Sequence, residues 1–237
     1  MTKKNNTKSK KLSKYYNLIN HNLIYDNHPI NRYKNNTPII SGNKAELLKK
    51  LASSIGSIKK CELKKNATNQ VFGDGNLNAK IMIVGEGPGA NEDKEGLPFV
   101  GRAGQLLDKM LLSINLNRKN VYITNVVNYR PPENRKPSEI EIKRYFPFLA
   151  RHIEIINPKI LLLLGSTALN TIIGDEEVIS KARGKWMKKK IGSCSTLVIA
   201  SFHPAFLMRQ QEQKKMAWID LKMIKKKMLE LKIKIEK

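Results

Sequence analysis

The segment Gly85–Ala90 (GEGPGA) carries glycines at the spacing of a dinucleotide-binding fingerprint, in which the backbone approaches a pyrophosphate closely. Three features weaken that interpretation. Pro88 lacks the amide that a phosphate would use, and the carboxylates of Glu86 and Glu92 would repel an anion. The acid about 20 residues further on, Asp108, falls in a helix-like stretch instead of at the end of a second strand. A purely structural turn would explain the glycines but not the carboxylates.

Two more polar residues have side chains suited to binding or catalysis, and each follows an apolar run. The amide of Asn125 offers a hydrogen-bond donor and an acceptor, although an asparagine at a strand end is most often a turn former. His203, which precedes Pro204, has a ring that can donate or accept a hydrogen bond. A lone histidine is usually structural. Whether these two residues are functional therefore depends on where the fold places them.

The elements that would position these residues alternate between apolar runs and helix-like stretches. Four runs suit buried parallel strands: Lys80–Val84, Val121–Asn125, Lys159–Leu164 and Thr196–Ser201. The helical stretches are 44–60, Gly104–Ile114, Glu139–Ile156, Ser166–Ile173 and roughly Met216–Leu231. Such alternation requires crossover connections. It predicts an α/β fold, a three-layer αβα sandwich with a central four-stranded parallel sheet.

The carboxyl ends of these strands would bring the polar residues together. Gly85 follows the first predicted strand, Asn125 closes the second, Ser166 comes after the third and His203 after the fourth. Ligands of open α/β sheets bind at this edge. The convergence of separate segments therefore favours a functional site there more strongly than any single motif does.

The formal net charge of +24 is spread along the chain. Residues 1–40 carry eight Lys and Arg against one acid, and residues 213–237 carry nine against three. This balance favours a polyanionic partner, because neutralised phosphates release counterions. A Lys- and Asn-rich composition with merely solvated lysines explains the tails equally well. We expect a basic N-terminal extension at 1–40, without ordered structure, and one domain at 41–237 that ends in a basic helix.

Cysteine usage and hydropathy indicate where the protein works. Cys61 and Cys194 are too few and too far apart for a disulfide framework, which favours a reducing compartment. The chain has no run of about 18 apolar residues that would span a membrane, and its N-terminus lacks the apolar stretch of a secretory signal. We expect a cytoplasmic monomer with no membrane partner.

A family resemblance extends over the whole expected domain. The stretch Gly85–Leu111 (GEGPGANEDKEGLPFVGRAGQLLDKML) resembles the signature of family 4 uracil-DNA glycosylases. The similarity continues in order through NQVFGDGN, VYITNVV, RPPENRKP, LLLLG, RGKW and FHPAFLMR, over roughly residues 45–230. It implies a monofunctional hydrolase that removes uracil from DNA in base excision repair and leaves an abasic site. The alternative is a nucleic-acid-binding relative that has lost its activity.

The resemblance implies a role for each residue at the sheet edge. Phe99 would stack on the uracil face, with core packing as the alternative, and Asn125 would read the O4 and N3–H edge of the base. His203 would donate to uracil O2, where negative charge develops as the glycosidic bond breaks. Glu86 would face the base, and the amide of Gly87 would contribute to the O2 pocket.

Water activation and DNA contacts complete the implied site. Glu92 is the favoured position for holding the water and stabilising an oxocarbenium-like sugar, although Glu86 stays an alternative for the water. The DNA contacts would come from Arg102, Arg130, Arg135, Leu207 and Arg209. Leu207, with its neighbour Met208, would act as a wedge in the base stack, for which core packing is an equal alternative.

The sequence departs from the family at its cofactor ligands. Typical family 4 members bind a [4Fe–4S] cluster through four cysteines. Cys61 matches the second of them, whereas Ile58, Tyr129 and about Tyr145 occupy the others. One thiolate cannot hold such a cluster, so we expect a protein with no metal and no cofactor. Tyr129 and Tyr145 would fill the vacated volume by packing.

Two variant chemistries are also disfavoured. A relative that traps DNA covalently uses a histidine near the Arg-Pro-Pro element, but Glu133–Ser138 (ENRKPS) contains none, and His152 falls on a predicted helix. No lysine stands out as a Schiff-base nucleophile, so simple hydrolysis is expected. The preference among U·G, U·A and single-stranded uracil, and the activity on other deaminated bases, stay open.

Overall fold

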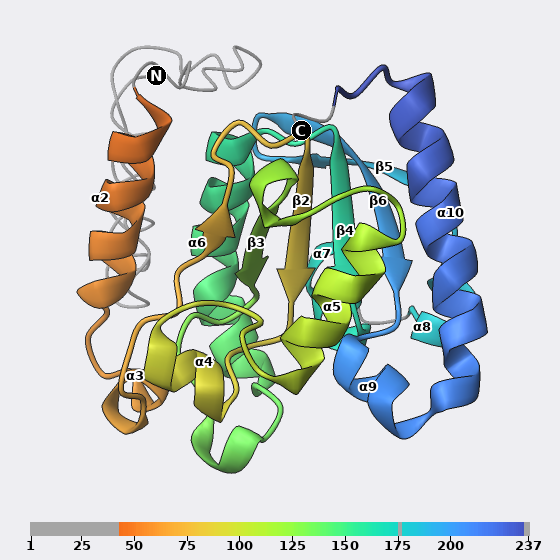
Figure 1. The fold of residues 1–237 in the computed structure, drawn as a ribbon. Helices are drawn as coiled ribbons and strands as arrows, with labels where there is room; N and C mark the ends of the chain where they lie inside the picture. The colour runs from red at the N-terminus through yellow and green to blue at the C-terminus, as the bar shows by residue number, and fades with distance from the viewer. Residues whose placement is uncertain (1–42, 175–176, 235–237) are drawn as a thin grey trace, which may run out of the picture. The chain divides into compact units, whose positions relative to one another are not determined.

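A six-stranded sheet forms the centre of the domain. The structure, a computed structural model, describes residues 43–174 and 177–234, so the basic extension expected at 1–40 lies outside the described residues. The strand order is β1-β3-β2-β4-β6-β5 (Figure 1). Four central strands run parallel: β2 (Ile81–Gly85), β3 (Tyr122–Asn125), β4 (Ile160–Leu164) and β6 (Cys194–Ser201). The predicted four-stranded parallel sheet is therefore the middle of a wider, mixed sheet.

Two antiparallel edge strands were absent from the prediction. β1 (Asp74–Gly75) pairs with β3, and β5 (Met187–Ile191) pairs with β6 through a tight turn at Gly192. Gly192 has a φ of +55°, a conformation that favours glycine. β1 is too short and polar to give a pattern. β5 (MKKKI) is half-exposed, and its lysines conceal the alternation of apolar and polar residues that marks a strand.

Successive residues of the central strands point to opposite faces of the sheet and supply two hydrophobic cores. Met82 and Val84 of β2 face one core, whereas Ile81 and Ile83 face the other. The first core is covered by α2 (Lys44–Gly56), α6 (Glu139–Ile156) and α7 (Ser166–Ile172). The second is covered by α5 (Arg102–Leu112), α9 (Pro204–Arg209) and α10 (Lys214–Glu230). In Figure 1, α5 lies in front of the sheet and α6 behind it, so the three-layer sandwich is confirmed.

Helix α6 has the bounds that the sequence predicts, because both of its ends carry strong local signals. The amide of Glu141 donates to the Ser138 hydroxyl, and the amide of Ser138 donates to the Glu141 carboxylate. Asn157 ends the helix in the left-handed conformation. Helices α5 and α10 begin at Arg102 and Lys214, slightly before their predicted starts, since their first turns are polar. The remaining helical segments are α3 (Glu62–Asn66), α4 (Ala90–Glu95), α8 (Ile179–Ala182), η1 (Arg118–Asn120), η2 (Pro132–Asn134) and η3 (Gln211–Gln213).

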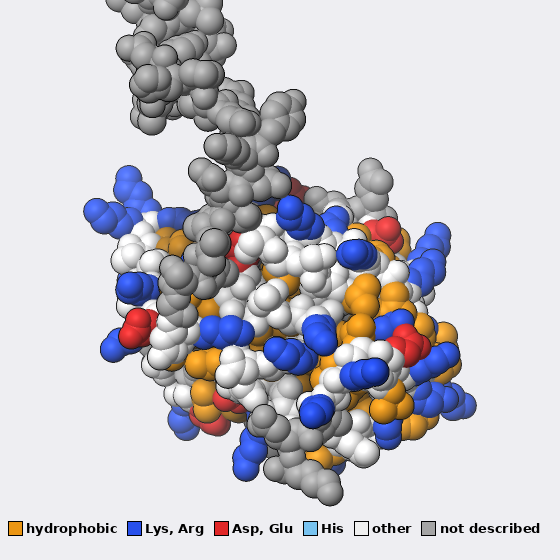
Figure 2. Space-filling model, turned by 90° about the horizontal axis from the view of Figure 1, so that it is seen from above, with side chains coloured by type: hydrophobic (Ala, Val, Ile, Leu, Met, Phe, Trp, Pro, Cys, Tyr) orange, Lys and Arg blue, Asp and Glu red, His pale blue; other side chains and the backbone are white. Residues whose placement is uncertain are grey.

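The two ends of the sheet differ in the loops that they carry. The arrows of β2 and β6 point toward α4 and α9, which lie around the carboxyl ends of the strands (Figure 1). Figure 2 shows the opposite end, where Lys and Arg side chains are spread with few acidic side chains among them. Positive charge is therefore not confined to the carboxyl edge. Within the described ranges, no helix is both long and apolar enough to cross a membrane.

Candidate active site

A pocket of about 170 Å³ opens at the carboxyl ends of the parallel strands. Its lining includes every residue that the sequence predicts for catalysis or base binding: Glu86, Gly87, Glu92, Phe99, Asn125 and His203. They come from the loop after β2, from α4, from the loop before α5, from the end of β3 and from the loop after β6. A larger hollow of about 580 Å³ lies between α6 and α7 but contains none of these six residues. The smaller pocket is therefore the candidate active site.

Asn125, the last residue of β3, presents an amide oxygen that lacks a partner. Its side chain is 3% exposed, and none of the described residues donates a hydrogen bond to its Oδ1. Gly85 pairs with Asn125 in the sheet, and a Cβ on Gly85 would collide with this oxygen. An unsatisfied buried acceptor typically costs about 1–3 kcal/mol. The pocket therefore holds an acceptor that suits the N–H donor of a ligand.

Phe99 forms the wall of the pocket beside Asn125. A Cβ on Gly85 would lie 2.6 Å from the Phe99 ring, so the ring packs closely over this glycine. The ring centroid lies 5.5 Å from that of His203, at an interplanar angle of 29°. The backbone of Phe99 has a φ of +55°, which is unusual for a bulky side chain and typical of strained functional sites. The ring is both part of the core and a surface on which a flat ligand could stack.

His203 caps α9 and is fixed in one tautomer. Its Nδ1 accepts a hydrogen bond from the amide of Ala205 at 3.2 Å, so the neutral ring carries its proton on Nε2. Burial lowers the pKa of His203 to about 4; the charge of Arg209 adds to this effect and that of Glu92 opposes it. The ring is therefore neutral near pH 7. It offers one N–H donor that can stabilise negative charge on a ligand oxygen.

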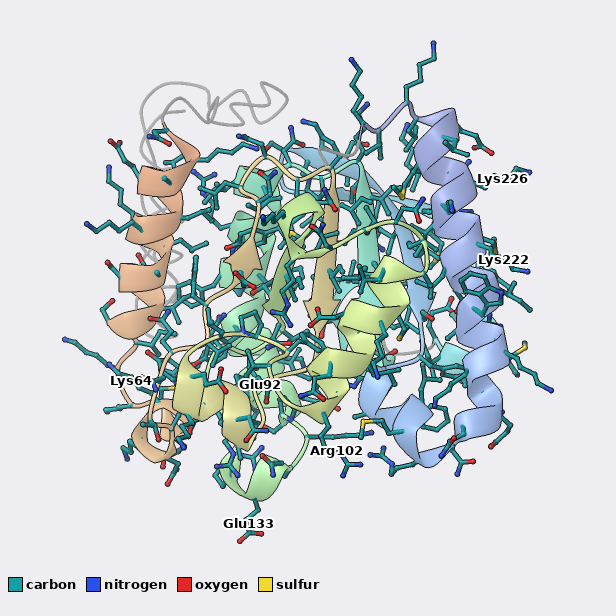
Figure 3. The ribbon with its side chains drawn as sticks, viewed as in Figure 1. Lys64, Glu92, Arg102, Glu133, Lys222 and Lys226 are labelled. Atoms are coloured by element: carbon teal, nitrogen blue, oxygen red, sulfur yellow. The ribbon has the colours of Figure 1, made fainter. Side chains whose placement is uncertain are left out.

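The carboxylate of Glu92, a residue labelled in Figure 3, is held by backbone amides of the loop around it. Its Oε1 accepts from Val100 at 3.0 Å and Gly101 at 2.8 Å, and its Oε2 accepts from Gly89 at 3.1 Å. A Cβ on Gly89 would lie 2.8 Å from Oε2, so this glycine leaves room for the carboxylate. Glu92 is fixed in position yet still lines the pocket, where its charge can stabilise a cation.

Glu86 is bound by a residue that the sequence analysis missed. The hydroxyl of Thr167, in the first turn of α7, donates to Glu86 Oε2. The apolar pattern of the sequence marks the end of β4, and Thr167 lies just beyond it, after Ser166. A single threonine there carries no signal of its own. Gly87, next in the chain, packs closely against Val127, since a Cβ there would lie 2.8 Å from the valine side chain. One oxygen of Glu86 is therefore bound to the first turn of α7, the helix that follows β4.

The arginines predicted to contact DNA differ in their surroundings. Arg135 lines the pocket and donates two hydrogen bonds to Glu141 at 2.8 and 2.7 Å, a pairing that lowers the pKa of Glu141 to about 2. Arg130 is bonded within its own loop. Arg102, at the start of α5, and Arg209, at the end of α9, are exposed. Figure 3 shows Arg102 at the end of the domain that carries the pocket.

Leu207, predicted to contact DNA, lies in the hydrophobic core beneath α9. It is 1% exposed. A side chain held in this core is not free to enter a base stack, so the structure favours the packing alternative for Leu207. Its neighbour Met208 is half-buried.

The residues at the family's iron–sulfur positions do not fit a cluster. Cys61, Tyr129 and Tyr145 are buried in one hydrophobic core, against which Ile58 packs. The Cys61 Sγ lies 3.3 Å from the Tyr145 hydroxyl, and burial raises the pKa of both tyrosines. A [4Fe–4S] cluster is held by four thiolates, whereas these positions supply one thiol, two phenols and an aliphatic chain. Across the described ranges, no group of three or more His, Cys, Asp or Glu side chains could hold a metal ion.

Comparison with known proteins agrees with this geometry. The family described as the Uracil DNA glycosylase superfamily matches residues 72–222. The type-4 uracil-DNA glycosylase of Thermotoga maritima is 44% identical over 170 residues, which are 70% of this chain and 85% of that protein. The type-4 enzyme of Archaeoglobus fulgidus is 40% identical over 183 residues, 76% of this chain and 92% of that protein. A type-5 enzyme from Pyrobaculum aerophilum is 28% identical over 147 residues, 55% of this chain and 63% of that protein. The chain belongs to the uracil-DNA glycosylase superfamily and, within it, to the type-4 family.

Proposed function

We propose that this protein is a uracil-DNA glycosylase that hydrolyses the N-glycosidic bond of uracil in DNA during base excision repair and leaves an abasic site. The buried, unpartnered Oδ1 of Asn125 carries the proposal. Uracil presents an N3–H donor beside its O4 acceptor, and one amide can pair with both. Cytosine presents an acceptor and a donor in the reverse order, so the same amide orientation excludes it.

The pocket groups around the base stabilise uracil as it leaves. The bond between the sugar C1′ and the base N1 breaks, its electron pair moves into the ring, and negative charge gathers on O2. The Nε2–H of His203 donates to O2, a kind of contact that typically contributes about 3 kcal/mol to transition-state stabilisation. Phe99 stacks on the extruded base. The amide of Gly87 also contributes to the O2 pocket, and Glu86 faces the base.

Glu92 acts on the sugar side. Its fixed carboxylate stabilises the oxocarbenium-like sugar and orients a water molecule. The water adds its oxygen to C1′, and the proton that it loses passes through solvent to N1 of the released uracil anion, so the products are neutral uracil and an abasic sugar. Arg102, Arg130 and Arg209 hold the DNA phosphates, with the start of α5 contributing backbone amides. Arg135, bound to Glu141, contributes mainly by shaping the pocket mouth.

One assay separates this function from that of an inactive DNA-binding relative. The protein is incubated with an oligonucleotide that contains one uracil, and the product is treated with alkali, which cleaves at abasic sites. Cleavage at the uracil position is expected, and its loss is expected in Asn125→Ala. Tight binding of the oligonucleotide without any cleavage would instead favour the binding relative. A panel of U·G, U·A and single-stranded substrates in the same assay would define the preference.

We also propose that the protein works without an iron–sulfur cluster. The packing of Tyr129 and Tyr145 against Cys61 supports this, because the phenol rings occupy the volume where ligands would be needed. The purified protein is expected to be colourless and active with less than about one iron per chain, against about four for a cubane cluster. A brown protein that absorbs near 400 nm and loses activity with its iron would overturn this part of the proposal.

A cytoplasmic location and a monomeric state complete the proposal. Both cysteines are free and buried, which supports a reducing compartment. Light scattering of the purified chain should give a mass near the 27.0 kDa of one copy.

A further inference from the structure

We propose that Arg118 is a positioning residue for base recognition, which holds the main chain of Phe99 in its left-handed conformation. The inference rests on the proposed function, because it takes Phe99 as the surface on which uracil stacks. Arg118 lies in η1, just before β3, and does not line the pocket. It would therefore act on the reaction only through the loop that carries Phe99.

The guanidinium of Arg118 bridges two successive carbonyls. Its Nη1 donates to the Pro98 oxygen at 3.0 Å, and its Nη2 donates to the Phe99 oxygen. The side chain is 26% exposed, so these contacts are partly shielded from water. A guanidinium presents its N–H groups as a rigid, planar fork, which can bind two neighbouring oxygens at once. An ammonium group has no such fixed geometry.

Two carboxylates hold the guanidinium in this position. The Nε of Arg118 donates to Asp108 Oδ1 at 3.0 Å, and Nη1 donates to Asp74 Oδ2 at 3.1 Å. Asp108 belongs to α5 and Asp74 to β1, so the arginine joins a helix, an edge strand and the pocket loop. This contact gives Asp108 a role in the fold, although its spacing from Gly85 suggested a nucleotide-binding acid.

The loop around Phe99 is fixed from both sides. On the carbonyl side, the first turn of α5 approaches so closely that a Cβ on Gly104 would collide with the Phe99 oxygen. On the other side, the next two amides, of Val100 and Gly101, donate to Glu92. Phe99 has a φ of +55° between these restraints. Because strained backbone persists only where its surroundings hold it, removal of Arg118 should release the carbonyl side of the loop.

The test compares Arg118→Met with a matched control, Arg144→Met. The guanidinium of Arg144 also donates to two successive carbonyls, those of Lys59 and Lys60, and Lys60 has a φ of +50°. Arg144 does not line the pocket. Each variant therefore removes a guanidinium that binds the carbonyl of a residue with a positive φ. Only the loop bound by Arg118 carries Phe99.

Two readouts are compared in the folded variants, with thermal melting used to check folding. In the free protein, the amides of Val100 and Gly101 should exchange with solvent about tenfold faster or more in Arg118→Met, and unchanged in Arg144→Met. With uracil-containing DNA, the single-turnover rate should fall about tenfold or more in Arg118→Met, while the Kd for abasic-site DNA changes less than about threefold. Equal behaviour of the two variants in both readouts would overturn the proposal.

A double-mutant cycle tests whether Arg118 acts through Phe99. If it does, Arg118→Met should lower the rate of a Phe99→Ala protein by less than about twofold, because the ring to be positioned is already gone. An equal loss in both backgrounds would contradict the positioning role. Arg118→Lys should recover only part of the rate, since an ammonium cannot bind both carbonyls with fixed geometry.

The two proposals fail in different ways. Absence of uracil excision by the unchanged protein would reject the proposed function. The exchange rates of Val100 and Gly101 do not depend on activity, so they would still decide the role of Arg118 in that case.

Discussion

Two side chains of the pocket are held by backbone amides and a third is fixed by burial, before any ligand binds. The Ala205 amide sets the tautomer of His203, and three amides hold the carboxylate of Glu92. Asn125 is fixed by burial at the end of β3. Preorganised groups of this kind stabilise developing charge without reorganising during the reaction. Substitution of any one of these three residues should therefore lower the rate of uracil excision more than it lowers DNA affinity.

Glu92→Gln tests the carboxylate itself. The amide keeps the size of the side chain but removes the charge that favours an oxocarbenium-like sugar. The single-turnover rate should fall about tenfold or more, with DNA affinity nearly unchanged. Glu95→Gln, on the exposed side of the same helix α4, is the matched control and should excise uracil normally. Unchanged excision by Glu92→Gln would remove Glu92 from the mechanism and leave Glu86 to position the water.

The pH profile tests the neutral state of His203. Because burial lowers its pKa to about 4, the ring keeps one protonation state from pH 8 down to about pH 5. The single-turnover rate should therefore show no inflection near pH 6.5, where an ordinary histidine titrates. An inflection there that disappears in His203→Asn would show that the imidazole changes its charge during activity measurements.

At the scale of elements, α6 is attached to the sheet through a buried histidine. His152 stacks on Phe72 with a ring separation of 4.4 Å, and its Nε2 lies 2.9 Å from the Tyr122 hydroxyl of β3. Burial lowers the pKa of His152 to about 3. This environment is that of a structural histidine, since a neutral ring fits between the helix and the strand.

Acid should destabilise the fold through this group. The unfolded chain binds a proton at His152 below about pH 6.5, whereas the folded chain does not until about pH 3, so the free energy of unfolding falls as the pH drops between these values. Between pH 7.5 and 5, the loss is about 2 kcal/mol for this one group. His152→Gln removes the titration and should shrink the pH-dependent loss in urea unfolding by about that amount. The same loss in both proteins would contradict the assignment.

Elements were predictable where local signals and burial agree. The bounds of α6 follow from the capping box at Ser138 and from Asn157, and the four parallel strands follow from their apolar runs. β5 was missed because a lysine, Lys189, occupies the middle inward-facing position and hides the apolar–polar alternation. Its pairing depends on the neighbouring strand β6, a tertiary contact that a local pattern does not contain.

At the scale of the whole domain, the parallel sheet delivered six predicted residues to one pocket. That convergence was predictable because strand ends are visible in the sequence and share one edge. Arg118 and Thr167 were not predictable, because they act through backbone carbonyls and a single carboxylate that only the fold brings near. Leu207 was ambiguous in the sequence, and its burial favours the packing alternative.

The distribution of charge leads to a prediction about DNA affinity. Lys222 and Lys226 lie on the outer side of α10, away from the pocket end where Arg102 is exposed (Figure 3). Neutralising Arg102 and Arg209 together should reduce the salt dependence of DNA binding by about two phosphate contacts. The double variant Lys222→Gln, Lys226→Gln removes the same charge. It should change the salt dependence of DNA binding by less than about half of one phosphate contact. Equal effects of the two pairs would show that binding responds only to total charge.

If this pocket releases uracil by hydrolysis, two products must form. The most direct measurement is mass spectrometry of both products after incubation of the purified protein with a duplex that carries one U·G pair. Free uracil and an unbroken strand with one abasic site are expected, and neither should form with Asn125→Ala. A strand that keeps its uracil, while the protein binds the duplex and remains folded, would contradict the account.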